Sequence, residues 1–230
     1  MIYLFTGTPG SGKSLHMARI ISKRLKSGLP TIGNFVINSD VKGYNSFTYV
    51  TNSNLCPDLL INFSVSYFGN DSIREGSIYL FIDEAQLLFN SRDWSRQNRM
   101  DWIEFMSQHR HYGYNIYMVT QTDRMLDRQI RSLAEYEVIH RKVSSFGFKG
   151  KLVRFFVGGE LFCAATKYYG MRSTEQVHTE FYRGSKKLYS FYDSYANYQQ
   201  VPSAVVRGAD LSAGSTSTRR VLVGSGASER

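Results

Sequence analysis

The sequence predicts an α/β fold in which helices cover both faces of a mainly parallel sheet. Short apolar runs of the length of buried strands alternate with stretches whose apolar residues recur at helical spacing. A glycine-rich phosphate-binding motif directly follows the first of these runs, and a pair of acids follows a later one. Open α/β sheets bind their ligands at the carboxyl ends of the strands, so both motifs are expected at one edge of the sheet.

The individual elements follow from apolar spacing and turn residues. The first run ends in a glycine-rich turn, and the helix after it ends at Gly28 and Pro30. The predicted strands are 2–5, 31–37, 47–51, 78–82, 115–120 and 136–141. The predicted helices are 12–27, 54–66, 102–109 and 125–134.

Beyond residue 142 the pattern changes. Residues 151–157 and 160–166 flank Gly158-Gly159, which predicts a β-hairpin with a two-residue loop. Residues 167–200 are rich in tyrosine and are interpreted as a mobile extension or a docking segment. Residues 201–230 lack periodicity and predict a disordered tail. The expected units are an α/β core at 1–142 that carries the glycine-rich motif, a basic, aromatic-rich hairpin and extension at 143–200, and the tail at 201–230.

Composition excludes several classes of protein. The 230 residues are 42% hydrophobic and 14% aromatic, which excludes a wholly disordered chain. The two cysteines, Cys56 and Cys163, lack the spacing of a zinc or disulfide framework. Neither a secretory signal nor an apolar run of ~18 residues is present, so no membrane-spanning helix is expected. The net charge of +9 favours an anionic partner: nucleic acid, a lipid surface or a nucleotide.

The strongest motif is Gly7-Thr8-Pro9-Gly10-Ser11-Gly12-Lys13-Ser14, a full match to GxxxxGK[ST]. Glycines let such a loop curl so that its N–H groups point at phosphate oxygens, and the following helix adds its positive dipole end. Lys13 is expected to reach the β- and γ-phosphates, and Ser14 to ligate Mg²⁺. The residues expected to bind the nucleotide are Gly7, Thr8, Pro9, Gly10, Ser11, Gly12, Lys13, Ser14 and Leu15. The alternative is an ordinary glycine-rich turn with a surface lysine.

Polar residues also end two later strands. Asp83 and Glu84 follow the strand 78–82, and adjacent carboxylates there are costly unless they lie near a cation. Asp83 is expected to hold Mg²⁺ and Glu84 to polarise the attacking water, which favours a hydrolase over a kinase. Alternatively, Glu84 caps a following helix. Gln121 ends a strand between the two motif strands, where it would contact the γ-phosphate or the lytic water, unless it is an ordinary polar strand end.

Nearby histidines and arginines have weaker signals. His109 and His111 are two residues apart, off the i, i+4 spacing of helical metal ligands, which favours a core histidine at 109. An arginine from a neighbouring subunit can stabilise the transferred phosphate. The candidates for that catalytic role are Arg110 and Arg92, followed by Arg96 and Arg99. The alternative for each is a solvated surface arginine.

The basic charge is uneven along the chain. Residues 141–190 hold ten Lys and Arg against three Asp and Glu, a net of +7, interleaved with aromatics. This pattern favours single-stranded nucleic acid binding by stacking and charge, and its alternative is a solvated hairpin face. Because the excess lies outside the nucleotide motifs, a second anionic surface, nucleic acid or lipid headgroups, is expected.

The combined motifs resemble the zonular occludens toxin family, the filamentous-phage assembly ATPases related to the FtsK and HerA motors. The resemblance covers roughly residues 1–190. It rests on the phosphate loop, Phe81-Ile82-Asp83-Glu84-Ala85-Gln86, His109-Arg110-His111-Tyr112-Gly113, and the strand that ends in Gln121. It implies a RecA-like P-loop core in which Lys13, Ser14, Asp83, Glu84 and Gln121 match the family's motifs.

The resemblance also implies a function. We expect an Mg²⁺-dependent ATPase motor for filamentous phage (inovirus) virion assembly and extrusion, acting as a homo-oligomeric ring such as a hexamer with phage or membrane assembly proteins. Relatives usually continue into a transmembrane helix, whereas this chain ends in a polar segment. We therefore expect a cytoplasmic protein that reaches the cytoplasmic face of the host inner membrane through a partner. The alternatives are a DNA translocase or packaging ATPase and a nucleotide-dependent membrane-associated scaffold with little turnover.

Overall fold

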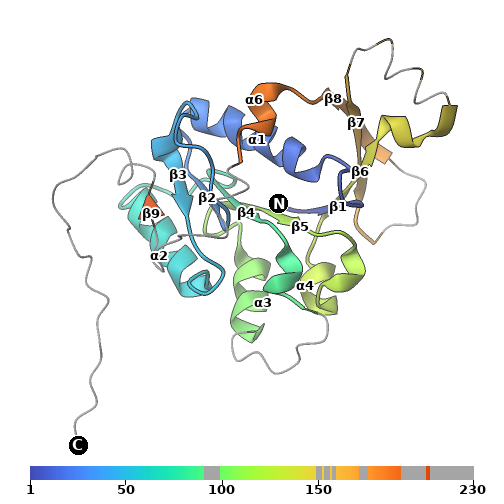
Figure 1. The fold of residues 1–230 in the computed structure, drawn as a ribbon. Helices are drawn as coiled ribbons and strands as arrows, with labels where there is room; N and C mark the ends of the chain where they lie inside the picture. The colour runs from blue at the N-terminus through green and yellow to red at the C-terminus, as the bar shows by residue number, and fades with distance from the viewer. Residues whose placement is uncertain are drawn as a thin grey trace, which may run out of the picture.

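A single sheet forms the centre of the molecule (Figure 1). The computed structural model describes residues 1–90, 99–148, 152, 156, 159–170, 176–192 and 206–207. Within them the sheet has nine strands in the order β8-β7-β6-β1-β5-β4-β2-β3-β9. The strands are β1 Ile2–Thr6, β2 Thr31–Gly33, β3 Phe47–Tyr49, β4 Ile78–Ile82, β5 Tyr114–Val119, β6 Tyr136–Lys142, β7 Leu161–Tyr168, β8 Gln176–Arg183 and β9 Val206–Arg207. Those from β6 to β3 are parallel, whereas β7, β8 and β9 are antiparallel to their neighbours.

Helices cover both faces of this sheet, as predicted. The helices are α1 Lys13–Lys26, α2 Pro57–Phe68, α3 Arg99–Gln108, α4 Arg128–Ser132 and α6 Lys186–Tyr189. Short 3₁₀ turns are η1 Tyr44–Ser46, η2 Ala85–Leu87, η3 Asp123–Met125 and η4 Val143–Ser145. Figure 1 shows α1 and α6 on one side of the sheet and α2, α3 and α4 on the other. The predicted α/β fold is therefore confirmed.

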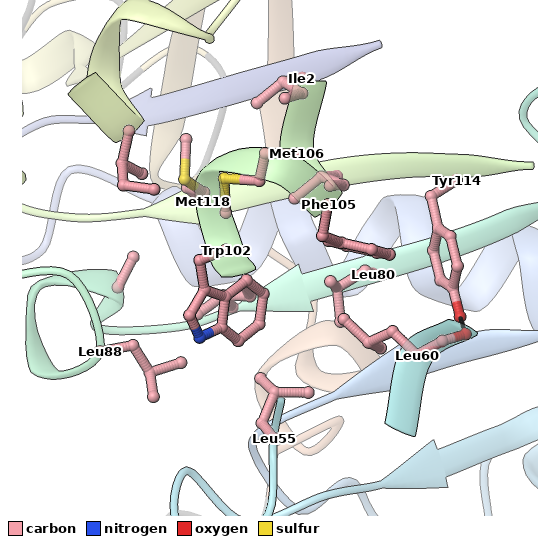
Figure 2. Packing of buried hydrophobic residues seen from close by; sticks show 14 of the residues in the cluster. Ile2, Leu55, Leu60, Leu80, Leu88, Trp102, Phe105, Met106, Tyr114 and Met118 are labelled. Atoms are coloured by element: carbon pink, nitrogen blue, oxygen red, sulfur yellow. Dashed lines mark hydrogen bonds between the residues drawn. The ribbon is translucent and has the colours of Figure 1, made fainter. Parts of the chain in front are cut away.

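The core consists of one apolar layer on each face. On the α1 face, Met17, Ile21 and Leu25 recur one turn apart and pack with the sheet. On the opposite face, Trp102 and Phe105 of α3 pack with strand residues (Figure 2). These layers hold the central strands in place. Because those strands are parallel, their carboxyl ends lie at one edge of the sheet.

Most predicted elements of the first 142 residues are confirmed, with shifted boundaries. Helix α2 begins at Pro57, three residues later than predicted. Proline is tolerated in the first turn of a helix because the N–H that it lacks would have no partner there. Strand β2 covers only three of the residues in the predicted strand 31–37. The predicted helix 125–134 is shortened to α4 because Asp127 caps its start, accepting from the N–H groups of Gln129 at 2.9 Å and Ile130 at 3.3 Å.

The C-terminal hairpin is present, but its strands differ from the prediction. Strand β7 overlaps the predicted second strand, 160–166, and extends beyond it to Tyr168; it pairs with β6 on one side and β8 on the other. Leu152 and Phe156 are helical, and the rest of 151–157 lies outside the described residues. The Gly158-Gly159 signal therefore placed the turn wrongly. Part of the segment interpreted as a mobile extension is β8 and α6, so the sheet continues past residue 142, and the division into units stays a prediction.

Two further expectations concern the C-terminal tail and membrane-spanning helices. In the predicted tail, 201–230, only Val206 and Arg207 are described, and they pair with β3 as β9. The remaining tail positions lie outside the described residues. Among the helices that the structure describes, none combines the length and the apolar character needed to cross a membrane.

Candidate nucleotide-binding site

The glycine-rich loop joins β1 to α1 and curls as its sequence requires. Gly7, Gly10 and Gly12 have φ angles of 145°, 74° and 99°, which side-chain-bearing residues rarely adopt. A Cβ at Gly12 would also lie 2.6 Å from the ring of Phe162 on β7. The Ser11 N–H donates to the Thr8 carbonyl oxygen at 3.1 Å, which tightens the loop. The bend therefore depends on glycine at these positions.

Lys13 lies across this loop. Its ammonium group donates to the carbonyl oxygens of Gly7 at 2.6 Å and Thr8 at 3.3 Å. Burial lowers the pKa of Lys13, while the charges of Glu84 and Asp83 act to raise it. The lysine is therefore within electrostatic reach of both acids. Next to it, Ser14 is exposed, whereas Leu15 is buried in the α1 core, so only the backbone of Leu15 remains available to a ligand.

The acidic pair follows β4, and Asn34 holds its backbone. The Asp83 N–H donates to Asn34 Oδ1 at 2.7 Å, and Asn34 Nδ2 donates to the Asp83 carbonyl oxygen at 2.8 Å. Burial raises the pKa of the Asp83 carboxyl to about 6, although the Glu84 N–H, which donates to Asp83 Oδ1 at 3.0 Å, acts to lower it. A poorly solvated carboxylate of this kind gains from a nearby cation. Asn34 was not predicted, because a single asparagine after a short strand gives no distinctive pattern.

Glu84 has an unusual backbone conformation. Its φ of 47° is the one positive value among non-glycine residues that the structure describes. Its side chain makes no capping bond to η2 and instead accepts from Gln86 Nε2. The geometry therefore does not favour the alternative in which Glu84 serves as a helix cap. Non-glycine residues in this conformation cluster at functional sites.

The order of the strands brings the motifs to one edge. Strand β5 pairs with β1 on one side and β4 on the other, as predicted from the position of Gln121. The Gln121 carbonyl oxygen accepts from the Gly7 N–H at 3.2 Å, so this residue adjoins the loop. A cleft of about 530 Å³ beside the loop is lined by loop residues, Gln121 and the end of β6 with its following turn. Its volume is in the range of small-molecule sites.

Two of the predicted arginines are described by the structure, and both form ion pairs. Arg110 pairs with Glu135 at 2.5 Å, and Glu135 accepts from the Ile2 N–H at 3.1 Å. Arg110 therefore lies at the amino end of β1, whereas the loop follows its carboxyl end. Arg99 pairs with Asp127 at 2.9 Å. Arg92 and Arg96 lie outside the described residues.

The histidines predicted near α3 are not arranged as metal ligands. His109 is buried, and its Nδ1 lies 2.7 Å from the Met106 carbonyl oxygen, consistent with a core histidine. In the part of the chain that the structure describes, no cluster of three His, Cys, Asp or Glu side chains is suitable for a metal ion.

A buried pair of histidines supports the loop, and the sequence did not indicate it. His140 Nδ1 lies 3.1 Å from the Thr6 carbonyl oxygen, and His140 Nε2 lies 2.9 Å from His16 Nδ1. A carbonyl can only accept, so His140 Nδ1 and His16 Nδ1 carry the protons. Burial lowers the pKa of His16 to about 4 and that of His140 to about 3, so both rings are neutral at pH 7. On the other side of the loop, the Tyr182 hydroxyl donates to the Gly12 carbonyl oxygen at 3.0 Å.

A second tyrosine approaches the site from the C-terminal side. The Tyr192 hydroxyl is buried and, among the described atoms, has no hydrogen-bond partner. Burial and the nearby Asp83 charge raise the Tyr192 pKa well above its usual value. The centroids of the Tyr192 and Phe35 rings are 5.2 Å apart. The carbonyl oxygen of the neighbouring Phe191 accepts a hydrogen bond from the Asn38 N–H at 2.9 Å. The sequence is dense in tyrosine here, but the spacing of these residues did not predict this position.

The family follows from a match that covers most of the chain. The family model described as zonular occludens toxin (Zot) matches residues 1–199. The chain belongs to the zonular occludens toxin family. This confirms the resemblance inferred from the phosphate loop, the acidic pair and the strand that ends in Gln121. With the β5 position between β1 and β4, it establishes a P-loop NTPase fold.

Individual relatives extend this assignment. The gene 1 protein of Enterobacteria phage M13 is 28% identical over 215 residues, which cover 84% of this chain and 59% of the phage protein. The gene 1 protein of Salmonella phage IKe is 27% identical over 171 residues, 70% of this chain and 46% of that protein. The chain therefore spans about half the length of these relatives.

Solved structures are similar at lower identity. The N-terminal domain of zonular occludens toxin from Neisseria meningitidis is 20% identical, with a TM-score of 0.49, over 84% of this chain and 98% of that domain. The genome packaging NTPase B204 from Sulfolobus turreted icosahedral virus 2, solved with ATP-gammaS, is 18% identical with a TM-score of 0.42, over 73% and 95% of the two chains.

Proposed function

We propose that this protein is an Mg²⁺-dependent ATPase that drives virion assembly and extrusion of a filamentous phage. The observation that carries the proposal is the meeting of the glycine-rich loop, Lys13 and the two acids at one edge of the sheet, with β5 between their strands. Family membership and the phage gene 1 relatives support the assembly role. A kinase is less compatible with an acid placed to activate water.

The residues of this edge have separate roles in the proposed reaction. Loop N–H groups and Lys13 bind the phosphates and neutralise their charge, which needs no reorganisation during the reaction. Ser14 and Asp83 would hold Mg²⁺, and their hydroxyl and carboxylate oxygens are the ligands that this ion prefers. Bound Mg²⁺ would supply positive charge to the phosphate oxygens. The poorly solvated Asp83 carboxyl, with its pKa raised to about 6 by burial, fits a cation ligand.

Glu84 is the proposed general base. Gln121 is proposed to contact the γ-phosphate or the attacking water. Glu84 is exposed beside the half-buried Asp83, so its carboxylate can take a proton from an attacking water. Gln121 adjoins Gly7 through its backbone, which keeps its side chain near the loop. Arg110 lies at the far end of β1, so it could act only on the site of a neighbouring subunit in a ring. Arg92 keeps the same proposed role in trans.

The test measures phosphate release by the full chain with Mg²⁺ and ATP over a range of protein concentrations. We expect specific activity to rise with concentration, because a ring supplies the arginine in trans. Lys13→Ala should abolish turnover. Glu84→Gln should retain binding of a fluorescent ATP analogue and lose turnover by about 10²-fold or more. Glu104→Gln, an exposed acid on α3, is the matched control.

Two results would contradict the proposal. Wild-type turnover by Glu84→Gln would remove this residue from its role. Background phosphate release by the wild type at every concentration, with nucleotide still bound, would favour the membrane-associated scaffold with little turnover.

A DNA translocase or packaging ATPase is the second candidate, because of the basic charge outside the nucleotide site. It predicts ATPase activity that DNA stimulates and that falls steeply with salt. In either case we propose a cytoplasmic ring, held at the inner membrane of the host by phage or membrane assembly proteins.

A further inference from the structure

A hollow of about 560 Å³ lies on the α1 face of the sheet, away from the cleft beside the glycine-rich loop. Its walls are α1, the segment 38–42 and the C-terminal segment 185–191 that includes α6. Figure 1 shows α6 lying over α1, and the two helices are in contact. The bond from the Asn38 N–H to the Phe191 carbonyl oxygen joins the other two walls. The hollow is therefore formed by elements that are distant in sequence and fixed to one another.

Cationic side chains dominate its lining. They are Arg19, Lys23, Lys26, Lys42 and Lys187, and the one carboxylate in the lining is Asp40. Arg19 pairs with Glu180 at 2.6 Å. Within the described part of the chain, the four lysines form no ion pair. Serine hydroxyls and the Asn38 amide complete a set of hydrogen-bond donors around an apolar floor.

Helix physics explains only part of this charge. Lys23 and Lys26 lie in the last turn of α1, where cations interact favourably with the helix dipole. That account does not extend to Lys42, which lies outside the helices, and Lys187 faces the same hollow from α6, which is only four residues long. Like charges gathered from three elements repel one another unless an anion with several charges lies among them.

We propose that this hollow binds the phosphodiester backbone of a single-stranded nucleic acid. Arg19, Lys23 and Lys26 present about one cation per turn of α1, or roughly every 5.4 Å, to a ligand that carries repeated charges. Lys42 and Lys187 neutralise phosphates from the opposite walls. The Ser22 and Ser185 hydroxyls donate to the same oxygens.

The shape and the nearby aromatics favour nucleic acid over a lipid surface. A bilayer is broad and flat, whereas these ammonium groups line a hollow with a buried floor, in which Phe191 is 3% exposed. An exposed aromatic lies on an adjoining element: Tyr189 on α6 is 56% exposed. Aromatics beside a cationic groove can stack bases without selecting a sequence.

This surface differs from the one that the sequence predicted. Of the five cations, only Lys187 belongs to the basic segment 141–190, while three come from α1 and one from the segment 38–42. Because no residue of the proposed catalytic edge lines it, nucleic acid binding there can be measured without ATP.

The test measures binding of the full chain to a fluorescein-labelled oligothymidine of about 30 nucleotides, longer than the roughly 4–16 nucleotides that a single-strand site covers. Anisotropy is recorded over a range of salt concentrations. Lys42→Gln/Lys187→Gln should weaken binding about tenfold near 0.1 M salt and reduce the log–log salt slope by about 1.4, or roughly 0.7 for each phosphate that is no longer neutralised. Arg74→Gln/Arg128→Gln removes the same charge from exposed positions elsewhere and should change the slope little.

Three outcomes would overturn the proposal. One is an unchanged slope in Lys42→Gln/Lys187→Gln, with thermal unfolding equal to that of the wild type. Another is an equal reduction of binding in the Arg74/Arg128 variant, which would indicate diffuse charge. The third is that Lys42→Gln/Lys187→Gln loses binding to vesicles of phosphatidylglycerol and phosphatidylcholine while its oligonucleotide binding is unchanged. That result would assign the hollow to lipid. ATPase activity without DNA should be equal in all these proteins, which separates failure of this proposal from failure of the ATPase assignment.

Discussion

The phosphate loop and the strands that support it are stabilised in different ways. The loop is shaped by its own backbone, through positive φ angles at its glycines and the bond from the Ser11 N–H to the Thr8 carbonyl. Its support comes from side-chain hydrogen bonds. His140 bonds to the Thr6 carbonyl oxygen, His16 bonds to His140, and Tyr182 bonds to the Gly12 carbonyl oxygen. These side-chain bonds join residues between 124 and 170 positions apart. The curvature of the loop is thus encoded locally, whereas its position in the site depends on the C-terminal half.

Gly12 belongs to both regions, so its substitution should have the largest effect. Gly12→Ala forces a side chain into a φ of 99° and places a Cβ 2.6 Å from the Phe162 ring. We expect a loss of about 3 kcal/mol or more in the free energy of unfolding, from backbone strain and overpacking that each cost about 1–3 kcal/mol. Urea denaturation measures the loss, and a fluorescent ATP analogue measures the accompanying loss of affinity.

Gly10→Ala separates these two contributions. Gly10 has a φ of 74°, but a Cβ there would meet no atom within 4 Å. Gly10→Ala should therefore be destabilised by backbone strain alone, without the contribution from overpacking. An equal loss of stability in the two variants would mean that contact with β7 does not help to fix the loop.

His140 tests the side-chain support through pH. Burial lowers the pKa of His140 to about 3, whereas an unfolded histidine ionises near pH 6.5. The unfolded state therefore takes up the proton first, so the stability from neutral His140 is complete above about pH 6.5 and is lost as the pH falls toward 3. His140→Asn keeps a donor for the Thr6 carbonyl and removes this titration.

Between pH 7 and 5 the wild type should lose about 1–2 kcal/mol more stability than His140→Asn. At pH 7.5 the variant should itself be less stable, by about 1–3 kcal/mol, because the His16 Nδ1–H loses its acceptor. Urea denaturation at both pH values gives these differences, and His111→Gln, an exposed histidine, is the control. Parallel pH profiles for wild type and His140→Asn would show that His140 is not held neutral.

Tyr182→Phe should have a smaller effect on the same support. It keeps the ring that packs on Phe162 and removes the donor to the Gly12 carbonyl. The expected loss is about 1 kcal/mol in the free energy of unfolding, with slightly weaker nucleotide binding. Tyr67→Phe, at an exposed position on α2, should change neither quantity. An unchanged Tyr182→Phe protein would mean that packing, rather than this hydrogen bond, connects β8 to the loop.

The two regions also differ in how far the sequence predicted them. The loop, Asp83, Glu84 and the position of β5 were predicted because each depends on consecutive residues with required chemistry. The supporting side chains were not, since His16, His140 and Tyr182 are single residues that meet only after β6, β7 and β8 pair. The turn was wrongly placed at Gly158-Gly159 because the prediction relied on local turn residues. The sequence of β8 is polar and does not resemble a strand, and β8 is a strand because it pairs with β7. Arg110 was predicted as a candidate trans-acting arginine, with a solvated surface arginine as the alternative. Only the fold shows that it lies at the amino end of β1, paired with Glu135.

Tyr192→Phe has the smallest predicted effect, and with Tyr192→Ala it tests whether the C-terminal segment acts on Asp83 by packing or by hydrogen bonding. Its ring packs on Phe35, while its buried hydroxyl has no partner among the described atoms. Removing an unpartnered buried hydroxyl relieves a desolvation cost of about 1 kcal/mol, so Tyr192→Phe should be equally or slightly more stable without nucleotide. Tyr192→Ala also removes the ring and should lose about 3 kcal/mol. A destabilised Tyr192→Phe would instead mean that the hydroxyl donates to a group such as the Asp83 carboxylate, which would make the C-terminal segment part of the proposed Mg²⁺ site.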